Sequence, residues 1–328
     1  MSIIVTGSIA TDHLMTFPGR FADSLVADKL DRISLSFLVD ALEVRRGGVA
    51  ANISFGLGCL GLRPVLVDAV GVDFADYRSW LERHGVDTES VRVSDVHHTA
   101  RFVCTTDLEA NQLASFYPGA MSEARDIELE PVVARVGRPD LVIIGPTDPD
   151  GMLRHTEECR QRGYAFAADP SQQLARMDGP EIRQLIDGAA YLFTNEYEAA
   201  LTEQKTGWSA QEILERVECR ITTLGANGSR VERRGQPAVE VGCPQEDTVV
   251  DPTGVGDAFR AGFVAGLAWG MPDHRCSQVG SMLATHVIET VGTQEYVLGR
   301  QRFLDRISEA YGEDAAADIG AHVRCPSP

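Results

Sequence analysis

Short apolar runs alternate with longer segments of helical character along most of this chain, and this alternation constrains the fold more than any other feature. Several of the apolar runs end in Gly, Asp, Asn or Thr, as strands do before a turn. We predict strands at Ile3–Val5, Val65–Val70, Leu141–Ile144, Ala165–Ala168, Tyr191–Phe193 and Ile221–Leu224. We predict helices at Ala50–Leu60, Tyr77–His84, Leu129–Val136, Gly151–Arg162, Glu181–Ile186 and Glu196–Lys205. The pattern therefore predicts an α/β fold with a central, mostly parallel sheet flanked by helices, whose ligands bind beyond the carboxyl ends of the strands.

Two regions break this alternation. Leu35–Glu43 and Arg101–Phe116 carry β-forming residues without a helix after them, and the second region includes the aromatic residues Phe102 and Phe116. We expect these regions to form a small antiparallel sheet appended to the main sheet. The pattern alone leaves open whether this sheet is a lid over the strand ends or an extension of one edge.

Composition narrows the class of protein. The net charge is 30 − 48 = −18 and no Lys/Arg-rich run is present, which argues against nucleic acid as a partner. Seven scattered cysteines without C-x-x-C spacing argue against a disulfide framework or a zinc site. The start lacks a basic, apolar signal, and no run approaches the ~18–20 apolar residues of a membrane span. We therefore expect a cytoplasmic protein.

The strongest local signal is the segment Asp251-Pro-Thr-Gly254-Val-Gly256-Asp257, which follows a β-prone pair and precedes a helical pattern. Gly254 and Gly256 allow the backbone to approach a ligand closely. The N–H groups at a helix start lack intrahelical acceptors and favour an anion such as a phosphoryl group. Asp257 would then lie where it can accept the proton of an attacking hydroxyl. A helix-capping carboxylate is the alternative, and the segment alone leaves both roles open.

Two further segments fit a phosphate-binding site, although each also has an ordinary structural explanation. Asn195 and Glu198 follow a predicted strand and could hold Mg²⁺ through water, or could form a capping box at the next helix. We favour the capping box for that pair taken alone. Thr223, Gly225 and Gly228 could hold a nucleotide, or could simply form a hairpin connection.

Near the start of the chain, polar residues suited to a sugar stand at predicted element ends. Asp12 follows Gly7-Ser8, and Asn52 follows the pair Gly47-Gly48 at the start of a predicted helix. A carboxylate, an amide and exposed backbone N–H groups are suited to vicinal hydroxyls. Turn and capping roles explain each residue singly.

Taken together and in this order, these segments resemble the PfkB/ribokinase carbohydrate kinases. Gly47-Gly48…Asn52 and Asp251…Asp257 are similar to the two family signatures. Asn195-x-x-Glu198 is similar to the family's magnesium-linked motif, and Thr223–Gly228 to its nucleotide loop. The resemblance implies a single ribokinase-like, three-layer kinase domain over residues 1–328, with a lid sheet inserted at about 13–47 and 93–120.

A finer resemblance is to the adenosine kinases of actinobacteria, of the mycobacterial type. It is carried by Ser34-Leu-Ser36-Phe-Leu-Val-Asp40, Thr99-Ala-Arg-Phe102, Ala114–Ser122 and Asp169–Arg176. This resemblance implies transfer of phosphate from ATP to the 5′-hydroxyl of adenosine, giving AMP and ADP in purine salvage. Another nucleoside, such as guanosine or inosine, or a sugar stays open as the acceptor. A nucleoside-binding regulator without transfer activity is the alternative outside the enzyme class.

The resemblance also implies the site residues. Those expected around the nucleoside are Ser8, Asp12, Ser36, Gly48, Asn52, Phe102, Phe116, Gln172, Gln173 and Arg176. Those expected around the nucleotide are Asn195, Thr223, Gly225, Gly228 and Gly256, beside the catalytic set Asp257, Gly254 and Gly256. The two phenylalanines would sandwich the purine, which gains about 1–3 kcal/mol from such stacking. A simple sugar would gain much less.

Cofactors and assembly follow from the same comparison. We expect Mg²⁺ near Glu198, with ATP as co-substrate. The family resemblance also suggests a K⁺ ion behind the anion site. Exposed lid edges are strands that natural proteins usually cover, so we expect a homodimer formed through the lid.

One departure from the common family signature is notable. Pro252 and Val255 replace Thr and Ala, and Pro252 removes one backbone donor, which leaves the number of N–H groups facing the phosphoryl open.

Overall fold

The main sheet of the protein has eight strands in the order β14-β13-β12-β11-β10-β9-β1-β4. The computed structural model describes residues 1–24 and 36–325. Neighbouring strands from β4 to β12 pair in parallel, and β13 and β14 add antiparallel at the far edge. The strands are β1 (Ile3–Thr6), β4 (Val65–Val67), β9 (Leu141–Ile144), β10 (Phe166–Ala168), β11 (Tyr191–Asn195), β12 (Arg220–Thr223), β13 (Ser229–Glu232) and β14 (Val239–Val241). The predicted fold class is therefore confirmed.

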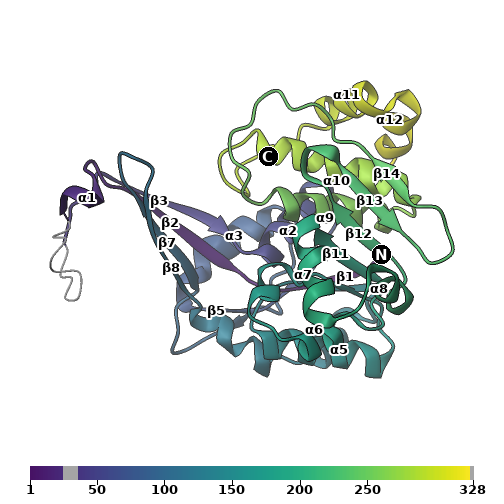
Figure 1. Cartoon of the computed structure of the whole chain (residues 1–328), viewed down its shortest axis with the longest axis horizontal. Helices are drawn as coiled ribbons and strands as arrows, with labels where there is room; N and C mark the ends of the chain where they lie inside the picture. The colour runs from purple at the N-terminus through teal and green to yellow at the C-terminus, as the bar shows by residue number, and fades with distance from the viewer. Residues whose placement is uncertain (25–35, 326–328) are drawn as a thin grey trace.

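Helices cover both faces of this sheet, and each face has its own hydrophobic core. Alternate residues of one strand enter different cores: Ile3 and Val5 face one cluster, whereas Ile4 faces the other. One face carries α2 (Val49–Cys59), α3 (Ala75–Arg83), α9 (Val255–Ala268), α10 (Asp273–Ile288), α11 (Arg300–Tyr311) and α12 (Glu313–Gly320). The other carries α4 (Leu129–Val136), α5 (Pro149–Arg162), α6 (Gly179–Ile186), α7 (Glu196–Thr206) and α8 (Ala210–Arg216). Figure 1 shows the central sheet between α10–α12 above and α5–α6 below.

A second sheet of four strands, in the order β3-β2-β7-β8, projects from the main body (Figure 1). Its strands are β2 (Ala10–Thr16), β3 (Ala41–Gly47), β7 (Ala100–Thr106) and β8 (Gln112–Tyr117). The expectation of a purely antiparallel sheet is wrong, because β2 and β7 pair in parallel. Asp12 was expected at an element end, but it lies inside β2. The predicted start of this sheet at Leu35, and Ser34 of the adenosine kinase-like motif, lie outside the described residues.

Smaller elements complete the connections. They are α1 (Phe21–Ser24), the strand pair β5 (Ala69–Val70) and β6 (Arg92–Val93), and short 3₁₀ segments at Val72–Phe74, Gly119–Asp126, Ser171–Ala175 and Gly225–Asn227. Within the described part of the chain, none of the helices combines the length and apolar character needed to cross a bilayer.

Candidate active site

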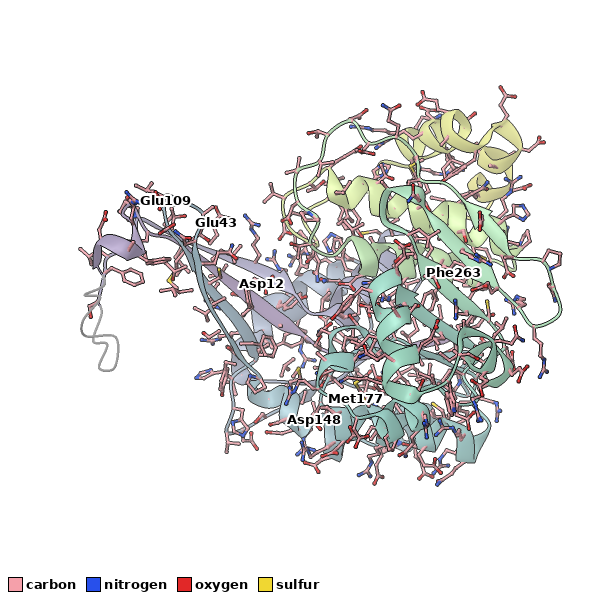
Figure 2. All side chains as sticks on the ribbon, viewed as in Figure 1. Asp12, Glu43, Glu109, Asp148, Met177 and Phe263 are labelled. Carbon is pink, nitrogen blue, oxygen red and sulfur yellow. The ribbon has the colours of Figure 1, made fainter. Side chains whose placement is uncertain are left out.

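A cavity of about 640 Å³ lies where the projecting sheet meets the carboxyl ends of the main strands. It is lined by Ser8, Ala10, Asp12, Gly47, Gly48, Val49, Asn52, Phe116, Pro118, Met121, Pro146, Gln172, Gln173, Arg176, Thr253, Gly254, Asp257 and Thr293. Figure 2 shows Asp12 on the inner part of the projecting sheet, with Glu43 and Glu109 at its far end. Most of the residues expected around the nucleoside therefore come together with Asp257. Two of them, Ser36 and Phe102, do not line this cavity.

The two phenylalanines expected at the base lie on neighbouring strands. Phe102 of β7 is paired directly with Phe116 of β8, and also with Asp12 of β2. Directly paired residues share one face of a sheet and are close neighbours. The two rings therefore stand side by side on one face of the sheet and do not form the two walls of a sandwich. Of the two rings, only Phe116, which is half exposed, borders the cavity.

The start of α9 has the backbone geometry expected of an anion site. Gly254 is the N-cap residue and has a φ of 77°, in the left-handed region that favours glycine. The N–H groups of Gly254, Gly256 and Asp257 have no acceptor among the described residues, whereas the N–H of Thr253 bonds to the Asp251 carboxylate at 2.9 Å. Three backbone donors at a helix N-terminus therefore remain for a ligand. The proline at position 252 does not reduce these three donors.

Asp257 lines the cavity, and burial raises the pKa of its carboxyl to about 6. Two groups oppose this rise in pKa. The Arg260 guanidinium lowers it through its charge, and Asn52 lowers it by donating a hydrogen bond from Nδ2 to Oδ2 at 2.8 Å. A carboxyl with a pKa near 6 is mostly ionised at pH 7 and is a stronger base than an ordinary aspartate. The site thus meets the chemical requirement for a general base.

Arg260 is a residue of the site that the sequence reasoning missed. Its guanidinium is buried, with Nε 2.6 Å from Oδ2 of Asp169 and one Nη 3.8 Å from Glu198. Burial raises the pKa of Asp169 to about 7, and the charge of Arg260 opposes that rise. The available signal was an arginine three residues after Asp257 in an otherwise apolar helix. A buried charge at such a position needs partners, which here come from the residue after β10 and from α7.

Asp12 is the second carboxyl of the cavity. Burial raises the pKa of Asp12 to about 6, and the charge of Arg45 opposes the rise. Gly48 caps α2 with a φ of 95°, and a Cβ there would lie 2.5 Å from the Ser8 carbonyl oxygen. The Ser8 hydroxyl accepts a hydrogen bond from the Val49 N–H at 3.1 Å. Ser8 therefore serves as a cap of α2 and also borders the cavity.

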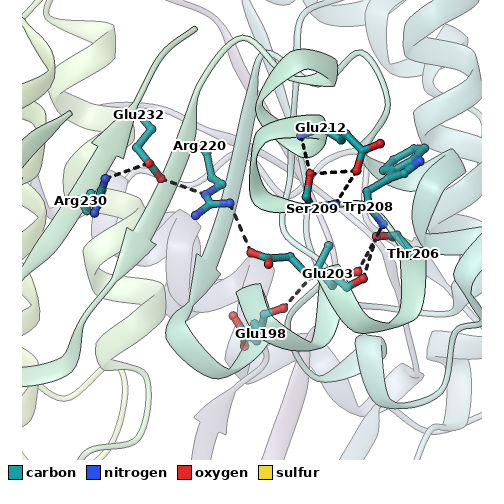
Figure 3. A network of polar contacts seen from close by, with 10 residues as sticks. Glu198, Glu203, Thr206, Trp208, Ser209, Glu212, Arg220, Arg230 and Glu232 are labelled. Carbon is teal, nitrogen blue, oxygen red and sulfur yellow. Dashed lines mark hydrogen bonds and ion pairs between the residues drawn. The ribbon is translucent and has the colours of Figure 1, made fainter. Parts of the chain in front are cut away.

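Asn195 and Glu198 form the capping box that was favoured for them. The Asn195 side chain accepts from the Glu198 N–H, and the Glu198 carboxylate accepts from the Asn195 N–H, both at 2.8 Å. Figure 3 shows Glu198 at the start of α7, beside a chain of ion pairs in which Arg220 bridges Glu203 and Glu232. In the described part of the chain, no group of three or more His, Cys, Asp or Glu side chains is arranged to hold a metal directly. Water-mediated binding of Mg²⁺ at Glu198 stays a prediction.

A second cavity of about 380 Å³ lies on the other side of the α9 start. It is lined by Thr223, Gly225, Ala226, Gly228, Cys243, Pro244, Glu246, Val249, Pro252, Val255, Gly256, Phe259, Ser281, Ala284, Thr285 and Ile288. The predicted nucleotide residues of the loop after β12 therefore border a largely apolar slot. The residues from α10 and from the segment after β14 were missed, because they follow the loop by fifteen residues or more. Since Gly254 borders the first cavity and Gly256 the second, the helix start with the unpaired N–H groups lies between the two.

Comparison with known proteins identifies the family of this chain. Residues 10–298 match the model of the pfkB family carbohydrate kinases. A solved nucleoside kinase of Burkholderia thailandensis in complex with inosine is 35% identical, with a TM-score of 0.81, covering 95% of this chain and 98% of that one. The same enzyme in complex with ADP-inosine is 36% identical, with a TM-score of 0.80, covering 95% and 96% of the two chains. A nucleoside kinase of Methanocaldococcus jannaschii is 26% identical over 86% of this chain and 92% of the relative.

These relatives are nucleoside kinases rather than adenosine kinases in particular, so the coarser resemblance is confirmed and the finer one is not. The chain belongs to the pfkB family of carbohydrate kinases, and it is a phosphotransferase that acts on an alcohol acceptor.

Proposed function

We propose that this protein is an ATP-dependent nucleoside kinase that phosphorylates the 5′-hydroxyl of purine nucleosides. The observation that carries the proposal is the cavity lined by Asp257, Asp12, Gln173 and Phe116, beside a helix start whose N–H groups at Gly254, Gly256 and Asp257 have no acceptor among the described residues. It combines a base and an anion site with polar groups for a ribose and an aromatic ring for a nucleobase. Its volume, about 640 Å³, is within the range of about 300–1,000 Å³ for small-molecule sites.

The buried side chain of Gln173 supports a nucleobase with an N–H group. Its Nε2 donates to the Thr147 carbonyl oxygen at 2.6 Å, which fixes the orientation of the amide. Its Oε1 is buried, has no partner among the described residues and belongs to a side chain that borders the cavity. An unpaired buried acceptor is costly, so a ligand that donates to it gains affinity. The amino group of adenine and the N1–H of hypoxanthine can both do so.

Adenosine, the substrate first expected, is therefore one of two leading candidates. The B. thailandensis relative was solved with inosine, which supports a nucleoside kinase that is not restricted to adenosine. Arg176 also borders the cavity and offers a cationic donor for the O6 carbonyl of a 6-oxopurine. We propose that inosine is accepted at least as well as adenosine.

In the proposed reaction, Asp257 accepts the proton of the 5′-hydroxyl. The bond from the 5′-oxygen to the γ-phosphorus forms as the bond from that phosphorus to the β-bridging oxygen breaks, and ADP leaves. The N–H groups of Gly254, Gly256 and Asp257 hold the charge on the phosphoryl oxygens. ATP would lie in the second cavity, along Thr223–Gly228.

Mg²⁺ would be held through water near Glu198, whose Oε1 has no partner among the described residues, and it would neutralise phosphate charge. K⁺ behind the anion site stays a prediction. Asp251, which precedes that site, already accepts from the N–H groups of Thr253 and Gly292.

The test is a coupled ADP-release assay with adenosine, inosine, guanosine, ribose and fructose 6-phosphate as acceptors. We expect turnover with the purine nucleosides and much weaker turnover with both sugars. Faster turnover of ribose or fructose 6-phosphate than of every nucleoside would contradict the proposal. Tight nucleoside binding without ADP release would instead favour the nucleoside-binding regulator.

A further inference from the structure

A buried chain of hydrogen bonds leads from the proposed base to the projecting sheet. The Asn52 Nδ2 donates to Oδ2 of Asp257 at 2.8 Å. On its other side, the Asn52 Oδ1 lies 2.9 Å from the Thr293 hydroxyl and 2.9 Å from the Gln294 Nε2, both of which can donate to it. Rotating the carboxamide by half a turn would place Nδ2 against these donors and Oδ1 against a carboxylate. The Asp257 carboxylate and the Gln294 donor therefore favour the orientation of Asn52 with Nδ2 toward Asp257.

The same two residues also hold the end of strand β3. The Thr293 hydroxyl lies 2.9 Å from the Arg46 carbonyl oxygen. The Gln294 Nε2 donates to the Tyr77 hydroxyl at 2.6 Å, and that hydroxyl donates to the Gly47 carbonyl oxygen at 2.9 Å. Arg46 and Gly47 are the last two residues of β3. The network thus joins the projecting sheet to the side chain that contacts Asp257.

Burial makes this network hard to replace. Asn52, Thr293 and Gln294 are 7%, 5% and 0% exposed, so water has little access to substitute for a lost donor. The Thr293 hydroxyl has a single proton but two acceptors at the same distance, the Arg46 carbonyl and the Asn52 Oδ1. It can donate to only one of them at a time. Gln294, with two N–H groups, can serve Asn52 and Tyr77 together.

We propose that Thr293 and Gln294 are positioning residues for phosphoryl transfer: they fix the Asn52 carboxamide so that Asn52 holds the Asp257 carboxylate in its reactive orientation. Both follow Asp257 by more than thirty residues and carry no role in the expected site. This inference rests on the proposed role of Asp257 as the base. It goes beyond that role, because it places the control of the base orientation in the segment after α10.

Charged groups also surround this network and must stay unchanged in the test. Arg260 and Glu198 face Asp257 through their charges, and Asp169 pairs with Arg260. On the other side, Arg46 is paired with Glu295 at 3.9 Å. Replacing Thr293 by valine leaves all of these charges in place and nearly preserves side-chain volume. A loss of activity in that variant would therefore reflect the lost hydroxyl.

The experiment compares kcat and KM for wild type, Thr293→Val, Thr293→Ser and the control Thr156→Val. Thr156 is fully buried and its hydroxyl donates to the Met152 carbonyl within α5, away from both cavities. We expect Thr293→Val to lower kcat by about tenfold, because small displacements of a reacting group are costly, with both KM values changed by less than about twofold. Thr293→Ser should restore kcat, and Thr156→Val should keep it.

A double variant separates positioning from a general structural effect. If Thr293 acts through Asn52, then adding Thr293→Val to Asn52→Ala should lower kcat no further, whereas independent effects would multiply. Multiplying effects, wild-type kcat in Thr293→Val, or a loss that Thr293→Ser does not restore would each overturn the proposal. Gln294→Met provides the same comparison if Thr293→Val does not fold, as judged by urea denaturation.

The acceptor in these assays is the one that wild type phosphorylates fastest among the nucleosides and sugars of the ADP-release assay. A preference for a sugar would therefore contradict the proposed nucleoside specificity and leave the test of Thr293 and Gln294 intact.

Discussion

Replacing Asp257 by asparagine tests the proposed base most directly. The substitution keeps the side-chain shape, and the new Oδ1 can still accept the hydrogen bond that Asn52 donates at 2.8 Å. Arg260 loses one nearby charge but keeps Asp169, whose Oδ2 is 2.6 Å from its Nε. The fold and the cavity should therefore persist, and the variant should lose mainly its ability to accept a proton.

The expected loss follows from the chemistry. General-base catalysis contributes about 10²–10⁴-fold to a rate, which corresponds to about 3–5 kcal/mol of activation free energy. We expect kcat of Asp257→Asn to fall by that factor, measured by ADP release, while the nucleoside dissociation constant from calorimetry stays within about threefold. Asp178→Asn is the matched control, since Asp178 caps α6 outside both cavities and asparagine caps equally well. A kcat of Asp257→Asn within about fivefold of wild type would refute the assignment.

The remaining predictions concern pH, the aromatic ring, the α2 start and the lid. The base must be ionised to accept a proton, and burial raises the pKa of Asp257 to about 6. We therefore expect kcat/KM to fall as the pH drops through about 6 rather than through about 4. The pKa of Asp12 is also near 6, and repeating the pH profile in Asp12→Asn separates its contribution from that of Asp257. Phe116→Ala should raise the KM for inosine by about tenfold or more and leave that for ATP unchanged, as steady-state kinetics would reveal. Gly48→Ala should lower the urea midpoint and abolish turnover, since its Cβ would lie 2.5 Å from the Ser8 carbonyl oxygen. Light scattering should give the mass of a dimer, because the projecting sheet has exposed edge strands. A monomer at micromolar concentration would contradict the expected homodimer.

Much of the fold was predictable because its signals are local. A run such as Leu141–Ile144 is buried on both faces and so consists entirely of apolar residues, which marks it as a central strand. The capping box joins Asn195 and Glu198, which are three positions apart, and it was readable from their spacing alone. Strand β2 was missed because the consecutive polar residues Asp12 and His13 break the alternation of apolar and polar residues that marks a strand. Asp12 borders the cavity. A residue of the candidate site thus weakened the pattern that predicts the strand.

The order of residues along the chain was enough to place Asp257 after two glycines at a helix start, because that arrangement is set within seven residues. The surroundings of this carboxylate depend on the assembled fold. Asn52 reaches it from 205 residues away, and the partners of Arg260 come from separate segments of the chain. Spacing along a chain cannot specify such contacts, because they depend on how the strands are ordered and how α2 packs against α9. Those long-range contacts tune the pKa of Asp257 and hold it in place, and they turn a capped helix into a candidate catalytic site.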